Sequence, residues 1–233
     1  MQIISLRKGF TSDHSSTSYE FLAVAEPLDR QAIEEVSSLS SRAQPTDRTV
    51  SFIYHGDFND LPGGWTPLMK EHFDIMYSES YDWWTFAVAF PVKTKEQRAE
   101  LAEYEFSGLE DLGVMIDFHK ERAVVSFYCT LDYGAAMPVL DNQGRDYRYY
   151  EEVDSFELED YLNNDRLFKL LSEVRQQLIT GDYRAFKVFW DVYGRPLYDE
   201  EAIQELKLPY DNNFDITTLP DNLKQFWNML AVV

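Results

Sequence analysis

The order of apolar segments constrains the fold of this chain more than any other feature of its sequence. Short runs of β-branched and aromatic residues, typical of buried strands, occur at 19–25, 49–54, 84–90, 114–118 and 123–130. Segments with helical spacing separate the first three runs and follow the third. Because strand, helix and strand alternate, we expect at least one parallel crossover.

The intervening helices carry recognisable start signals. Asp29 is a good N-cap before Ala32 and Val36, and Thr66-Pro67 combines a hydroxyl cap with a proline at the first helical position. The second of these helices is expected to extend to Met76, because Leu68, Met69, His72, Phe73 and Met76 share one helical face. A third, charged helix is expected over 95–105.

The last third of the chain is helical by pattern. Apolar stripes with helical spacing occur at 167–178, 186–193 and 219–230, and Gly181 ends the first of them. The sequence therefore predicts an α+β fold, with a mixed sheet of about five strands, helices on one face and a C-terminal helical element. We expect a sheet region over 1–145 and a helical region over 146–233 that packs on it to form one compact domain.

Charge and composition narrow the class of protein. The 233 residues include 41 Asp and Glu against 21 Lys and Arg, a formal net charge of -20. Such an excess of acid makes nucleic acid an unsuitable direct ligand. With 45% hydrophobic and 15% aromatic residues, however, the chain is much richer in core-forming side chains than a disordered acidic tail.

The single cysteine and the lengths of the apolar runs indicate the cellular compartment. Cys129 is the single cysteine and lies in an apolar strand-like run, so we expect a buried structural thiol, no intramolecular disulfide and a reducing environment. The N-terminal residues lack the features of a secretory signal, and no apolar run approaches the roughly 18 residues that span a bilayer. We therefore expect a cytoplasmic protein that does not enter a membrane.

The chain contains, in this order, the phrases Tyr19-Glu20-Phe21, Pro27-Leu28, Ser38 to Ala43, Gly56-Asp57-Phe58, Leu68 to Asp74, Leu178 to Trp190, and Leu219-Pro220 with Leu223 and Phe226. Together these phrases resemble a family of uncharacterised bacterial proteins of similar size. Where family members carry Asn-Trp-Gly-Thr-Arg-Arg before a strand, this chain has 81–86, Tyr-Asp-Trp-Trp-Thr-Phe, and lacks the paired arginines. The family has no assigned activity, and its members are often encoded near SWIM zinc-finger proteins, which implies a role in a protein or nucleoprotein assembly.

Two groups of residues are candidates for a ligand-binding, catalytic or metal site. Asp13 and His14 lie in a Ser/Thr-rich segment over 11–18, which fits a structural loop, a ligand- or phosphate-binding loop, or, least well, a catalytic loop. The pattern His-x-Asp occurs twice, at 55–57 and 72–74, and suggests a metal site. On one helix, however, His72 and Asp74 would diverge by about 200°, so we assign no metal ligand, no catalytic residue and no cofactor.

The segment 146–161 mixes tyrosines with acids and is the strongest candidate for a binding surface. Tyrosines rimmed by acids suit protein recognition, because they bury a large area at a small entropic cost. A solvated acidic face is the alternative interpretation. The candidate binding residues are Tyr147, Tyr149, Tyr150, Glu151, Glu152 and Asp154, together with Asp13 and His14.

From these observations we expect a non-enzymatic component of an assembly that binds another protein, and a basic partner would complement its charge. The main alternative is a DNA mimic or another electrostatic inhibitor of a basic partner, which requires its carboxylates to lie on one surface at regular spacing. A third possibility is a hydrolase or metal-dependent enzyme that uses His14, His55 or His72. The sequence indicates no oligomeric state.

Overall fold

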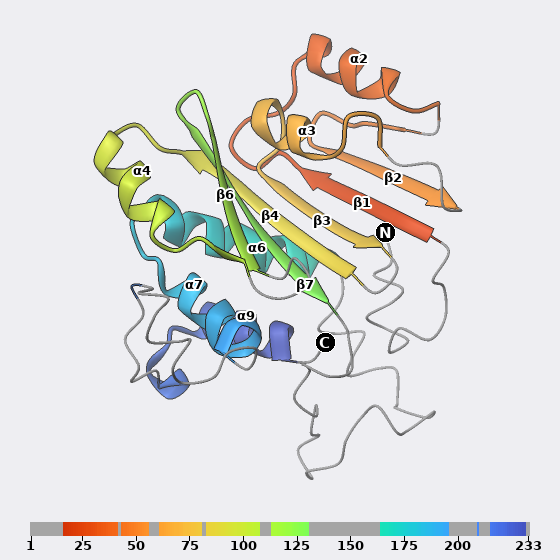
Figure 1. Cartoon of the computed structure of the whole chain (residues 1–233). Coiled ribbons are helices and arrows are strands. Elements are labelled where there is room, and N and C mark those ends of the chain that lie inside the picture. The colour runs from red at the N-terminus through yellow and green to blue at the C-terminus, as the bar shows by residue number, and fades with distance from the viewer. Residues whose placement is uncertain are drawn as a thin grey trace, which may run out of the picture.

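A seven-stranded antiparallel sheet forms the centre of the fold, with strand order β2-β1-β3-β4-β7-β6-β5 (Figure 1). The structure is a computed structural model that describes residues 16–41, 43–55, 61–80, 83–107, 113–130, 164–195, 209 and 215–231. The strands are β1 (Ser16–Leu22), β2 (Thr49–His55), β3 (Ile75–Ser80), β4 (Trp83–Pro91), β5 (Phe106–Ser107), β6 (Gly113–His119) and β7 (Arg122–Thr130).

The helices of the described ranges lie between the strands and after them. In chain order they are α2 (Arg30–Ser38), α3 (Thr66–Glu71), α4 (Lys95–Ala102), α6 (Asn164–Ile179), α7 (Arg184–Phe189), the π-helical turn η3 (Trp190–Gly194), the 3₁₀ turn η5 (Ile216–Thr218) and α9 (Asp221–Ala231). The α+β class expected from the sequence is therefore correct. No helix in the described ranges is long and apolar enough to cross a membrane.

The sheet differs from the expected mixed sheet of about five strands. Every pairing between the described strands is antiparallel, so the expected parallel crossover is wrong. The reason is β3, which the sequence analysis assigned in part to a helix. The helix ends at Glu71, and Ile75–Ser80 inserts as a strand between β1 and β4.

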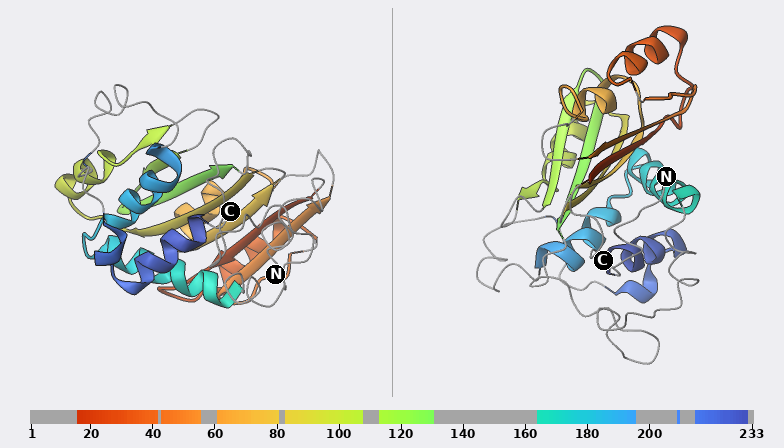
Figure 2. Two further views of the ribbon diagram at one scale, coloured as in Figure 1. Left: turned by 90° about the horizontal axis from the view of Figure 1, so that it is seen from below. Right: turned by 90° about the vertical axis from the view of Figure 1, so that its right-hand side faces the viewer.

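Helices cover both faces of the sheet, rather than the one face expected from the sequence (Figure 2). The faces of β4 explain this arrangement, because both of them are apolar. Phe86 and Val88 pack into a core that includes residues of α6, α7 and α9. Ala87 and Ala89 point the other way, into a second core that includes residues of α2 and α3.

Aromatic rings form the centre of the larger core. Phe86 of β4 stacks on Phe127 of β7 with ring centroids 4.5 Å apart, and Phe189 and Phe226 contact both rings edge-on. Cys129 lies two residues beyond Phe127 on the same face and has no exposed surface, which confirms the expected buried thiol. Four elements that are distant in sequence thus meet around one pair of rings.

Local signals explain how three of the helices begin or end. The Asp29 side chain accepts a hydrogen bond from the Ala32 backbone N–H at the start of α2, as expected from the sequence. Thr94 and Gln97 form a reciprocal capping box at the start of α4. Gly181 follows α6 with φ of +80°, a left-handed conformation in which glycine has no steric penalty.

Candidate functional site

The binding residues proposed from the sequence lie outside the part of the chain that the structure describes. Their arrangement therefore stays a prediction. They are Tyr147, Tyr149, Tyr150, Glu151, Glu152, Asp154, Asp13 and His14.

The second His-x-Asp pair does not form one site. His72 follows α3, and its Nε2 lies 3.3 Å from Glu35 Oε2 of α2, whereas the Asp74 carboxylate is buried in a different network. In the first pair, the His55 side chain and the whole of Asp57 lie outside the described residues. Within the described ranges, no three His, Cys, Asp or Glu side chains are grouped so that they could hold a metal ion.

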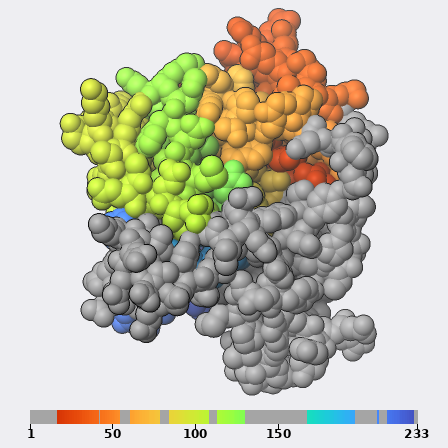
Figure 3. Space-filling view, viewed as in Figure 1, coloured from red at the N-terminus to blue at the C-terminus, as the bar shows by residue number. Residues whose placement is uncertain are grey.

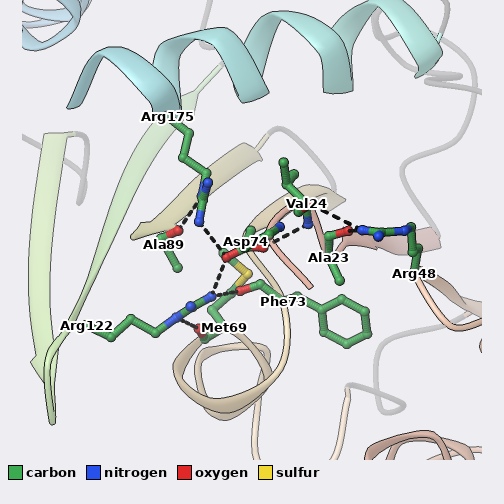
Figure 4. A network of polar contacts seen from close by, with 10 residues as sticks. Ala23, Val24, Arg48, Met69, Phe73, Asp74, Ala89, Arg122 and Arg175 are labelled. Carbon is green, nitrogen blue, oxygen red and sulfur yellow. Dashed lines mark hydrogen bonds and ion pairs between the residues drawn. The ribbon is translucent and has the colours of Figure 1, made fainter. Parts of the chain in front are cut away.

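Asp74 is the centre of the most extensive buried polar network in the described structure (Figure 4). Its Oδ2 accepts hydrogen bonds from the backbone N–H groups of Val24 at 2.8 Å and Ala25 at 2.7 Å. Its Oδ1 accepts from Arg122 Nη2 at 3.0 Å and from Arg175 Nη2 at 2.9 Å. One carboxylate therefore joins the segment after β1, the start of β7 and the C-terminal half of α6.

The two guanidinium groups also bind backbone carbonyls. Arg175 Nε donates to Ala89 O of β4 at 2.6 Å. Arg122 Nε donates to Met69 O of α3 at 2.9 Å, and Arg122 Nη2 also donates to Phe73 O. The network thus connects helices on opposite faces of the sheet, α3 and α6, through the strands between them.

The network has one more positive than negative charge. The side chains of Asp74 and Arg175 are 4% and 6% exposed, and burial lowers the pKa of the Arg175 guanidinium while the Asp74 carboxylate opposes that shift. Because four donors surround the Asp74 carboxylate, it offers little capacity to act as a base or to bind a metal. Its contacts instead hold the surrounding strands and helices in position, which is a structural role.

The His-x-Asp pattern suggests Asp74 as a metal ligand, and the sequence does not indicate that Arg122 and Arg175 are its partners. One signal was present: Arg175 follows Leu171 and Val174 and precedes Leu178, so it lies on the apolar stripe of its helix. A charged side chain in such a position needs a buried partner of opposite charge. No local sequence pattern indicates which carboxylate is the buried partner of Arg175.

A second, more exposed polar cluster joins α3 to the β6–β7 hairpin. Glu71 Oε1 lies 2.7 Å from His119 Nε2, and both Glu71 oxygens lie 2.9 Å from Lys120 Nζ. The hydrogen bond from Lys120 is the largest cause that lowers the pKa of Glu71. Lys70 pairs with Asp117 beside this cluster. His119 therefore lies in a surface ion-pair cluster.

Acidic side chains and one tyrosine come together at α4 and directly after it, in a region that the sequence pattern does not single out. Glu96, Glu100 and Glu103, which we call the acidic ridge, are exposed and spaced at i, i+4 and i+7, so they follow one face of the helix. Tyr104 is half-buried beside them. Burial, and then the charges of Glu100 and Glu103, raise the pKa of Tyr104.

Aromatic contacts hold Tyr104, which lies beside the acidic ridge, against the start of α7. The Tyr104 ring lies 5.2 Å from the ring of Tyr183 and stacks on Phe186 of α7 at 4.9 Å between centroids. Burial is also the main cause that raises the pKa of Tyr183, followed by the charge of Glu100. In the space-filling view, α4 lies at the left-hand rim of the molecule (Figure 3). The ridge is therefore an exposed acidic strip on a rigid aromatic support.

Many basic side chains in the described ranges make polar contacts with other residues of this chain. Each lies within ion-pair distance of a carboxylate or donates to a backbone carbonyl of this chain. They are Arg30, Arg48, Lys70, Arg98, Lys120, Arg122, Arg175, Arg184, Arg195 and Lys224.

Comparison of the chain with protein-family models, with curated proteins and with solved structures found no match.

Proposed function

We propose that this protein is a non-enzymatic, cytoplasmic component of an assembly and that it binds a basic protein partner through the acidic ridge of α4. The observation that carries the proposal is the position of Glu100 and Glu103, exposed next to the half-buried ring of Tyr104. Carboxylates around an aromatic side chain provide both attraction and contact area for a partner.

The charge of the whole chain supports this proposal. A net charge of -20 produces a long-range field that attracts basic proteins and raises their association rate at low salt. The resemblance to a family whose members are often encoded near SWIM zinc-finger proteins supports a role in an assembly. The acid- and tyrosine-rich segment 146–161 is proposed as a further part of the binding surface.

Capture from a native lysate at low salt tests the proposal. The full chain is compared with Glu100→Lys/Glu103→Lys, which reverses the ridge while leaving Glu96 in the first turn of α4, where a negative charge is favourable. A matched control, Glu26→Lys/Glu34→Lys, changes the net charge equally at exposed positions away from α4. Circular dichroism confirms that each variant is folded.

We expect specific partners to bind the wild type and the control but not the ridge variant. Equal capture by the two variants would show that net charge, rather than the ridge, attracts the partner. Failure of the wild type to retain any specific protein would contradict the proposal as a whole. Competition by duplex DNA for the same captured protein would favour the alternative function, a DNA mimic.

A further inference from the structure

The outer edge of β2 has backbone groups that are not paired within the described structure. The hydrogen bond from Ala23 N to Arg48 O shows which residues face the neighbouring strand, because the two directions alternate along an antiparallel pair. Positions 48, 50, 52 and 54 thus direct their backbone N–H and C=O groups toward β1. Thr49, Ser51 and Ile53 direct theirs away from the sheet.

A local turn satisfies the first of these three residues. The Thr46 N–H donates to Thr49 O at 2.8 Å, and the Thr49 N–H donates to Thr46 Oγ1 at 2.8 Å. No hydrogen bond joins the outward N–H or C=O groups of Ser51 and Ile53 to another residue in the described ranges. The open part of the edge therefore begins at Ser51.

The side chains of β2 keep this edge extended and accessible. Val50 and Phe52 are buried, at 2% and 3% exposed, and anchor the strand to the core shared with α2 and α3. The Ser51 hydroxyl donates to Glu20 Oε1 at 2.6 Å. Ile53 is 47% exposed. Natural edge strands are usually protected by lysine, proline or a bulge, and none of these occurs within β2.

We propose that this edge binds an extended, basic peptide segment of another protein, which adds to the sheet as an antiparallel strand beside Ser51 and Ile53. Such a strand would exchange hydrogen bonds with both residues and place an apolar side chain against Ile53. The site goes beyond the proposed function, because β2 and α4 lie at opposite ends of the molecule (Figure 1).

Charge favours a basic peptide over a second copy of this chain as the occupant of the β2 edge. Residues 16–55, which form β1, α2 and β2, contain six carboxylates against three arginines. Arg30 pairs with one of these carboxylates, Glu34, and six carboxylates minus three arginines leave the segment with an excess of three negative charges. Two copies of a chain with a net charge of -20 repel each other, whereas a lysine- or arginine-rich strand is attracted.

A synthetic peptide in which lysine alternates with threonine or valine is a suitable probe. Its affinity for the full chain is measured by fluorescence anisotropy, and its position by the amide NMR signals and hydrogen exchange of Ser51 and Ile53. One control peptide has alternate backbone nitrogens methylated, which removes its hydrogen-bond donors. Another control peptide has glutamate in place of lysine.

We expect the probe to shift and protect the Ser51 and Ile53 amides, and alternate N-methylation to weaken its binding about tenfold or more. The glutamate peptide should bind much more weakly. Equal affinity of the methylated and unmethylated peptides, or signal changes confined to α4, would overturn the proposal. So would concentration-dependent protection of both amides without the probe, which would identify a second copy as the occupant.

Variants of Ile53 provide a test from the protein side. Ile53→Pro removes the outward N–H but leaves the hydrogen bonds to β1, because Ile53 faces away from that strand. Ile53→Thr keeps the N–H and is the matched control. We expect the proline variant to lose probe binding and the threonine variant to retain it. The ridge variant Glu100→Lys/Glu103→Lys should also retain it, so failure of the proposed function and failure of this site give different results.

Discussion

Arg175 Nη2 lies 2.9 Å from Asp74 Oδ1, although the two residues are 101 positions apart in the chain. This contact connects the helical C-terminal part of the described chain to the turn between α3 and β3. Because both side chains are almost completely buried, removing the Asp74 charge leaves the two guanidinium groups without a carboxylate. The stability of the fold should therefore depend strongly on this network.

Asp74→Asn should destabilise the protein by about 3–5 kcal/mol, because it leaves two guanidinium groups around a neutral side chain. Asp182→Asn is the control, since Asp182 pairs with Arg184 at the surface and such pairs contribute about 0–1 kcal/mol. Urea unfolding of both variants gives the comparison. Similar losses of unfolding free energy from the two substitutions would show that the buried network stabilises the protein no more than a surface ion pair does.

Arg175→Met should cost less than Asp74→Asn, about 1–3 kcal/mol, because Arg122 still neutralises the Asp74 carboxylate. Methionine also continues the apolar stripe of α6. The ranking of the two variants by urea unfolding tests whether the network has an excess of positive charge. A larger loss from Arg175→Met than from Asp74→Asn would contradict this interpretation.

Much of the fold could be predicted, because the strands β1, β2, β4, β6 and β7 coincide closely with apolar runs in the sequence. The strand β3 was missed for a physical reason. Ile75 and Tyr77 enter one core and Met76 the other, so β3 lacks the alternation of a half-buried strand and follows a helix directly. The two-residue strand β5 depends on its pairing with β6.

The polar sites were harder to predict, because their partners are distant in sequence. The Asp74 network joins segments around 24, 122 and 175, and no local pattern connects these positions. The acidic ridge was visible as a charged helix, but the contact of the neighbouring Tyr104 with Tyr183 depends on how α7 packs. Acid spacing alone therefore did not distinguish this ridge from an ordinary solvated face.

Phe127→Ala should destabilise the protein by about 3–5 kcal/mol, because it opens a cavity among rings that have no exposed surface. Met115→Ala on the adjacent strand removes a side chain that is 51% exposed and should change stability by less than about 0.5 kcal/mol. Thermal and urea unfolding measure both effects. Equal effects would show that the aromatic centre is not the main core.

Cys129 should make the stability of the protein fall at alkaline pH. Burial raises the pKa of its thiol well above the ordinary value of 9.0, so the folded state keeps a proton that the unfolded state releases. Unfolding is therefore favoured as the pH rises through the unfolded-state value. The fall in urea-unfolding free energy between about pH 8 and pH 9.5 should be smaller in Cys129→Ala.

Thiol labelling tests the same burial independently. The native protein should react with iodoacetamide only as fast as it unfolds, since the thiol has no exposed surface. Labelling of the native state at the rate of a free thiol, or an unchanged pH dependence in Cys129→Ala, would contradict the prediction.

Lys120→Gly separates backbone strain from surface charge in the β6–β7 hairpin. Lys120 has φ of +52°, which costs an L-residue roughly 1 kcal/mol or more and costs glycine little. The substitution also removes the ion pair with Glu71, an exposed contact worth about 0–1 kcal/mol. In the wild-type background the two effects should nearly cancel. In a Glu71→Gln background, where the ion pair is already absent, Lys120→Gly should stabilise by about 0.5–1 kcal/mol. A double-mutant cycle by urea unfolding measures the difference, and destabilisation by glycine in both backgrounds would show that the positive φ carries no strain.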